Sequence, residues 1–84
     1  MSQREIGARC DLGPVLDPGV WAKLPDSKKA QVLWWCGCPG VRPDGDGWVA
    51  RFKRGDRIRG PDRERVLEQT RGFLAVSPDL WPLA

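Results

Sequence analysis

Residues 47–69 read GWVARFKRGDRIRGPDRERVLEQ, and this stretch decides the predicted fold. In its first part, Trp48, Ala50 and Phe52 alternate with residues that are mostly basic. Side chains of an extended chain point alternately to its two sides, so this pattern indicates a strand with one buried face. We predict that strand over Trp48–Lys53.

A hairpin follows from the next residues. Gly55 lies within an Arg-Gly-Asp sequence and, lacking a side chain, easily adopts the positive φ of a turn. The chain then returns as a second antiparallel strand over Arg57–Arg59. One face of the hairpin is apolar and includes Ile58. The opposite face collects the basic side chains Arg51, Lys53, Arg57 and Arg59.

The last part of the stretch predicts a helix from Pro61 to about Phe73. Proline suits the first helical position, and Asp62 and Glu64 suit the positive end of the helix dipole. Mostly apolar residues then recur every three or four positions, as on a helix face that packs against a sheet. These residues are Val66, Leu67, Thr70, Phe73 and Leu74.

Residues 25–40, PDSKKAQVLWWCGCPG, allow two interpretations. A helix would begin at Asp26 or Ser27 and end at Gly37. A strand would use the β-branched and aromatic residues that follow the lysines. Because a hairpin comes next, we favour the strand.

The favoured strand spans Val32–Cys38. The segment Pro43–Gly47, dense in proline, aspartate and glycine, is then the loop that leads into the hairpin. The sequence therefore predicts an α+β fold, with a small three-stranded antiparallel sheet packed against one C-terminal helix.

Three segments make up the predicted chain. Residues 26–76 form the sheet-plus-helix core. Residues 1–25 form an arm and loop-rich segment from which Trp21 anchors on the core, and residues 77–84 form a tail from which Trp81 folds back.

Positive charge is concentrated in one place. Residues 51–65 hold seven basic and three acidic side chains, a local sum of +4, whereas the whole chain sums to +3 and the remainder to −1. A basic segment on a nearly neutral body is typical of a surface that binds a polyanion, and nucleic acid is favoured over membrane. The alternative is an ordinary solvated surface.

The sequence also bears on location. No apolar run approaches the ~18 residues of a membrane span, and residues 1–9 are too polar for a signal peptide. Three cysteines, an odd number, suit a reducing compartment. We expect a cytoplasmic protein, monomeric or dimeric, with no membrane partner.

Catalytic and metal chemistry have little support. The chain has no histidine, so a nucleophile such as Cys36 or Ser27 lacks its usual base. Cys10, Cys36 and Cys38 supply three of the four donors that tetrahedral zinc requires, and Asp11 would have to complete the set. Buried thiols acting as small hydrophobic side chains are preferred. We expect no enzyme activity, catalytic residue, cofactor or metal.

The adjacent tryptophans Trp34 and Trp35 would face opposite ways on a strand. One would then enter the core, and the other would be exposed to stack on an unpaired base or to seat a protein partner. The alternative is that the arm and the tail bury both.

Part of the chain resembles a known family. The residues that carry the resemblance are Gly47-Trp48-Val49-Ala50-Arg51-Phe52, Arg57-Ile58-Arg59-Gly60, and the helix through Arg65, Val66, Leu67 and Phe73. They resemble the amino-terminal arm-binding domain of phage-type tyrosine integrases and the related plant apetala-type DNA-binding domain. The resemblance implies a three-stranded sheet that lies in the DNA major groove with a helix behind it.

Two functions are therefore weighed. The first is a small accessory protein of a phage or mobile element that binds nucleic acid, with duplex DNA favoured, through the basic hairpin. The second is a protein-binding inhibitor or adaptor, of the phage anti-host or anti-CRISPR kind, that occupies a host protein handling nucleic acid. The residues expected to bind the partner are Arg51, Lys53, Arg54, Arg57, Arg59, Arg63 and Trp35.

Overall fold

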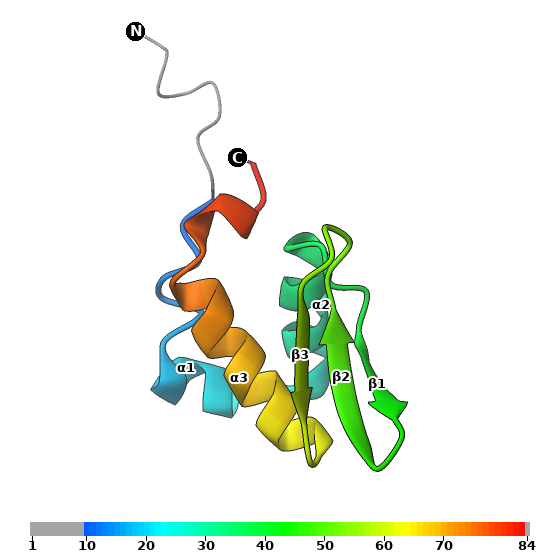
Figure 1. Cartoon of the computed structure of the whole chain (residues 1–84). Helices are drawn as coiled ribbons and strands as arrows, with labels where there is room; N and C mark the ends of the chain where they lie inside the picture. Colours follow the sequence, from blue (N-terminus) through cyan, green and yellow to red (C-terminus); the bar gives the residue numbers. More distant parts are fainter. Residues whose placement is uncertain (1–9, 84) are drawn as a thin grey trace, which may run out of the picture.

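The computed structural model of the chain describes residues 10–83 and has an α+β fold (Figure 1). The elements in order are α1 (Pro18–Lys23), α2 (Asp26–Trp35), β1 (Val41–Asp44), β2 (Gly47–Arg51), β3 (Arg57–Gly60), α3 (Arg63–Ala75) and the 3₁₀ helix η1 (Pro78–Leu80). The predicted fold class, with its three-stranded antiparallel sheet and C-terminal helix, is confirmed. Residues 1–9 of the predicted arm and residue 84 of the predicted tail lie outside the described part.

The sheet is an antiparallel meander in the order β1-β2-β3. Ala50 in the central strand lies opposite Val41 on one side and Ile58 on the other. Because cross-strand partners share a face, these apolar residues form a single inner face, which also carries Trp48. The helix α3 packs on this face and contacts all three strands (Figure 1).

The interpretation of residues 32–38 as a strand is wrong, because the helix α2 spans Asp26–Trp35. Val32, Leu33 and Cys36 are buried at helical spacing, and this packing outweighs the β propensity of the segment. The helix ends in a Schellman motif: Gly37 has φ +89°, and the Cys38 N–H donates to the Leu33 carbonyl at 2.8 Å.

The first strand of the sheet is instead β1, and this also corrects the predicted loop over Pro43–Gly47. Pro43 and Asp44 belong to β1, and the turn to β2 contains only two residues, of which Gly45 has φ +61°. Positive φ at the first turn residue alone is the pattern of a type II′ hairpin. Proline is tolerated in β1 because β1 is an edge strand.

The second hairpin and the following helix agree more closely with the prediction. Gly55 has φ +117° in the turn, and the Phe52 N–H donates to the Asp56 carbonyl at 2.8 Å. The helix α3 begins two residues later than predicted, because Asp62 is its N-cap and accepts a hydrogen bond from the Arg65 N–H at 2.8 Å.

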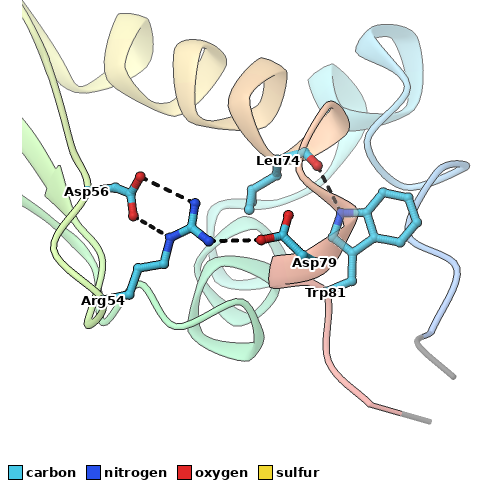
Figure 2. Close-up of polar contacts among 5 residues, drawn as sticks. All are labelled: Arg54, Asp56, Leu74, Asp79 and Trp81. Atoms are coloured by element: carbon cyan, nitrogen blue, oxygen red, sulfur yellow. Dashed lines mark hydrogen bonds and ion pairs between the residues drawn. The ribbon is translucent and has the colours of Figure 1, made fainter. Parts of the chain in front are cut away.

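Both terminal segments pack on the central part. Trp21 is buried, as predicted, in the same hydrophobic cluster as Phe52 and Leu67. Trp81 folds back as predicted and donates from Nε1 to the Leu74 carbonyl at 2.9 Å (Figure 2). The Cys10 N–H donates to the Pro82 carbonyl at 2.8 Å, so the two ends of the described chain lie side by side.

Candidate nucleic-acid interface

The outer face of the sheet, turned away from the hydrophobic core, is strongly basic. Val49 at its centre lies opposite Arg42 on β1 and Arg59 on β3. Two residues farther along β2, Arg51 lies opposite Arg57. Strand alternation places these side chains on the same side, and all four arginines are exposed. We call this set of four arginines the basic face.

Arg51 and Arg57 are a like-charge pair at close quarters. The hydrogen bond from Phe52 to Asp56 makes the neighbouring pair, Arg51 and Arg57, the non-hydrogen-bonded kind, in which opposing side chains are closest. Like charges directly opposite each other destabilise a sheet. Within residues 10–83, no carboxylate forms an ion pair with Arg42, Arg51 or Arg57.

The fourth arginine of the basic face is neutralised. Arg59 forms an ion pair with Asp44 at 3.0 Å, although the two residues belong to the opposite edge strands. Gly47 on β2 lies opposite Asp44, and a Cβ at this position would clash with the Gly60 carbonyl oxygen. The basic face therefore has a neutralised end, at Asp44 and Arg59, and an unneutralised end formed by the other three arginines.

The unneutralised end surrounds a hollow of about 390 Å³. Its lining residues are Arg42, Pro43, Asp44, Val49, Arg51 and Arg57. Val49 is only 5% exposed although it lies outside the core cluster, and we attribute its burial to the aliphatic stems of the surrounding arginines. The three arginines give the hollow a formal charge of +3, since the one aspartate in its lining, Asp44, is neutralised by Arg59.

Two of the residues predicted to bind a partner, Arg54 and Arg63, form ion pairs with other parts of the fold. Arg54 forms ion pairs with Asp56 at 2.5 Å and with Asp79 of η1 at 2.9 Å, so it ties the β2–β3 turn to the C-terminal segment (Figure 2). Its hydrogen bond holds the pKa of the Asp56 carboxyl below the usual range. Arg63 forms an ion pair with Asp26 at 3.3 Å.

Lys53, predicted for the basic side of the hairpin, contacts Trp34 instead. Its Nζ lies 5.3 Å from the centre of the Trp34 ring, a cation–π distance, so Trp34 lies next to the β2–β3 turn. The expectation that one of the two adjacent tryptophans enters the core is wrong, and so is the alternative that both are buried. On the helix α2, Trp34 is 59% exposed and Trp35 is 48% exposed.

Arg42 is the site residue that the sequence analysis missed. The signal was present in VRPDGDGWVAR, where a two-residue Gly-Asp turn brings the residues before it alongside the strand after it. Assigning residues 43–47 to a loop hid that pairing, and with it the position of Arg42 opposite Val49.

The thiols are placed for packing. Cys36 and Cys38 are buried and Cys10 is exposed, all three without a disulfide. Burial, with a smaller effect of the neighbouring Cys38, raises the pKa of Cys36 to about 11, so its thiol is protonated and unreactive at neutral pH. The described residues contain no group of three potential metal ligands, and no helix among them is long and apolar enough to cross a membrane.

Comparisons of the chain with known protein families, with curated proteins and with solved structures find no significant match. The resemblance to the integrase arm-binding domain therefore stays a prediction.

Proposed function

We propose that this chain is a nucleic-acid-binding protein that docks the basic face on the phosphates of its partner, with duplex DNA as the first candidate. The observation that supports the proposal is the set of three exposed arginines, Arg42, Arg51 and Arg57, for which the described chain provides no carboxylate. Such a set can accept an external anion, and phosphate is one of the two anions, with carboxylate, that arginine binds through paired N–H donors.

The shape of the surface is compatible with a groove. Strands of four or five residues present the arginines from a short, rigid platform, and β-ribbons of this kind enter the grooves of duplex DNA. The proposal is of a binding protein rather than an enzyme, working in the cytoplasm as an accessory factor of a phage or mobile element. Three unpaired thiols accord with such a reducing location.

The test is the salt dependence of binding to a labelled DNA duplex, measured by fluorescence anisotropy. If each of the three arginines neutralises about one phosphate, replacing Arg42, Arg51 and Arg57 with alanine flattens the slope of log affinity against log salt by ~2–3 units. The matched control replaces Lys23, Lys28 and Arg65, exposed basic residues of the three α-helices, with alanine.

Both variants lose three positive charges, so a general effect of net charge would lower affinity equally in the two. A loss confined to the sheet variant supports the basic face as the interface. Absence of binding by the parent protein at low salt would eliminate the nucleic-acid proposal.

One observation favours a second candidate function, binding of a host protein. Trp34 and Trp35 are both about half exposed at the end of α2, and exposed tryptophans commonly anchor protein interfaces. An apolar hollow of about 260 Å³ adjoins Trp35 and is lined by Cys10, Leu12, Pro82 and Leu83. A partner that is captured after nuclease treatment, and lost with Trp34→Ala and Trp35→Ala but not with the arginine variant, would support this function.

A further inference from the structure

We propose that the hollow between Arg42, Arg51 and Arg57 receives a single terminal phosphate monoester of a nucleic-acid strand, such as a 5′-phosphate, rather than successive phosphodiesters of a continuous backbone. This inference rests on the proposed nucleic-acid function and specifies the chemical group that the basic face recognises. It follows from the clustering of the arginines, from the charge of the hollow and from the position of Asp44.

The three arginines are clustered rather than arranged in a row. Arg51 and Arg57 are direct cross-strand partners, and Arg42 lies on the other neighbouring strand, opposite Val49. Adjacent strands are ~4.8 Å apart and residues rise ~3.3 Å along a strand, so the Cα atoms of Arg42 and Arg57, two strands and two residues apart, are ~12 Å from each other. The three arginines line one hollow, and a second, adjoining hollow of about 160 Å³ shares Arg42, Val49 and Arg51 with it. Such a cluster suits one compact anion with several acceptor oxygens.

The charge of the hollow favours a dianion. A phosphate monoester carries a charge of about −1.5 to −2 at pH 7, with a second pKa of about 6, and has three strong terminal acceptor oxygens. A backbone phosphodiester carries one negative charge. Of the formal charge of +3 that the three arginines give the hollow, one monoester neutralises up to two units and one diester only one.

Asp44 sets the limit of the site. Its carboxylate lines the hollow and also accepts the ion pair from Arg59 at 3.0 Å. A backbone that continued across the sheet toward Arg59 would place its next phosphate at the neutralised end of the basic face, where Asp44 already occupies Arg59. A strand that ends in the hollow needs no counter-charge there, because only its terminal group lies between the three arginines.

Val49 strengthens the recognition. Its side chain is 5% exposed and forms an apolar floor to the hollow, so a bound phosphate has water on fewer sides than it would on an open surface. Charge-assisted hydrogen bonds from the guanidinium groups become stronger where water is partly excluded.

The experiment compares two oligonucleotides of the same sequence, labelled at the 3′ end, that carry either a 5′-phosphate or a 5′-hydroxyl. Anisotropy at pH 7.5 is expected to give at least ~10-fold tighter binding of the phosphorylated strand, the effect of one strong charge-assisted contact. The preference is expected to shrink as the pH falls below ~6, where the monoester loses its second charge.

Substitutions in the hollow test whether its arginines cause the preference for the 5′-phosphorylated strand. Arg51→Ala and Arg57→Ala are each expected to reduce the ratio of the two affinities to about 1, and Arg51→Lys to restore part of it. Arg65→Ala is the control, since it removes an exposed positive charge from α3, outside the lining of the hollow, and it should leave the ratio at or near the parental value. Thermal melts of every variant establish that it is folded.

The outcomes distinguish failure of the terminal-phosphate inference from failure of the proposed nucleic-acid function. Equal binding of both oligonucleotides would overturn the terminal-phosphate inference and leave the nucleic-acid function standing, whereas binding of neither would overturn both. A preference that survives Arg51→Ala and Arg57→Ala would place the phosphate elsewhere and also overturn the inference. A nucleoside 5′-monophosphate that competes as strongly as the whole oligonucleotide would show that the source is a free nucleotide, which overturns the strand-end assignment.

Discussion

The like-charge pair on the basic face allows stability and binding to be separated with one substitution, Arg57→Glu. In the parent protein, Arg57 faces Arg51 at the closest kind of cross-strand position, with no carboxylate paired to either within the described chain. Glutamate at position 57 replaces that repulsion with an attractive pair. We expect the variant to be more stable and to bind nucleic acid more weakly.

The size of the stability gain follows from the geometry. Directly opposite charged pairs change sheet stability by ~0.2–1 kcal/mol each, and exposure to solvent keeps such values small. Reversing the sign of one pair should therefore raise the free energy of unfolding by ~0.5–1 kcal/mol, or the melting temperature by ~2–8 °C for a domain of this size. Binding should fall at least ~10-fold, because the formal charge of the hollow drops from +3 to +1.

Arg59→Glu is the matched control, since it makes the same chemical change on the same strand. There the new carboxylate replaces a residue that is paired with Asp44 at 3.0 Å, so attraction becomes repulsion and stability should fall by ~0.5–1 kcal/mol. Urea denaturation followed by tryptophan fluorescence measures both variants, and anisotropy on the duplex measures binding. Equal destabilisation by the two substitutions would contradict the repulsion between Arg51 and Arg57, and parental affinity in Arg57→Glu would contradict a role of Arg57 in binding.

Three further predictions test the fold. Gly37→Ala should lower the free energy of unfolding by ~1–2 kcal/mol, because φ is +89° at this position after α2. Gly72→Ala should raise it by ~0.5–1 kcal/mol, because Gly72 lies inside α3 and nothing is within 4 Å of the added Cβ. Similar effects of the two substitutions in urea denaturation would contradict the helix ending at Gly37. Phe52→Ala should cost ~3–5 kcal/mol, since the ring is 5% exposed and packs edge-on against Phe73 at 5.4 Å, and a melting temperature within two degrees of the parent's would place the ring outside the core. The fold raises the pKa of the Cys36 thiol from 9.0 to about 11, so the stability that the protonated thiol contributes is complete below pH 9 and is lost as the pH rises to 11. Over that pH range the melting temperature should fall more steeply for the parent than for Cys36→Ala.

The sequence predicted those parts of the fold in which neighbouring residues alone decide the structure. The alternation from Trp48 to Phe52 indicates which side of a strand is buried. The spacing from Val66 to Leu74 indicates the buried face of a helix. Neither pattern depends on contacts with distant parts of the chain. Residues 26–38 depend on distant contacts instead. There, burial of Val32 and Leu33 against the rest of the core, together with the helix-ending geometry at Gly37, overrides the local β propensity.

The candidate site was predicted only to the extent that the strands were. Arg51, Arg57 and Arg59 were placed correctly on one face because the hairpin that carries them was correct. Arg42 was missed because its place depends on the turn at Gly45. Arg54 and Arg63 were assigned to the partner because a sequence does not reveal that Asp79 and Asp26, far along the chain, lie within ion-pair distance of them.

The arginines divide into those that are paired with a carboxylate and those that are not, and this difference bears on function. Arg54, Arg59 and Arg63 each meet a carboxylate, so their positions are explained by the fold. Arg51 and Arg57 lie opposite each other, and together with Arg42 they line a hollow that has Val49 at its floor. An uncompensated cluster of this kind gains stability only when an anion enters it, because binding of a ligand to the native state alone adds its binding free energy to that of folding. The same three residues should therefore make the melting temperature rise when a 5′-phosphorylated strand is added, and Arg57→Glu should abolish that rise while raising the melting temperature of the free protein.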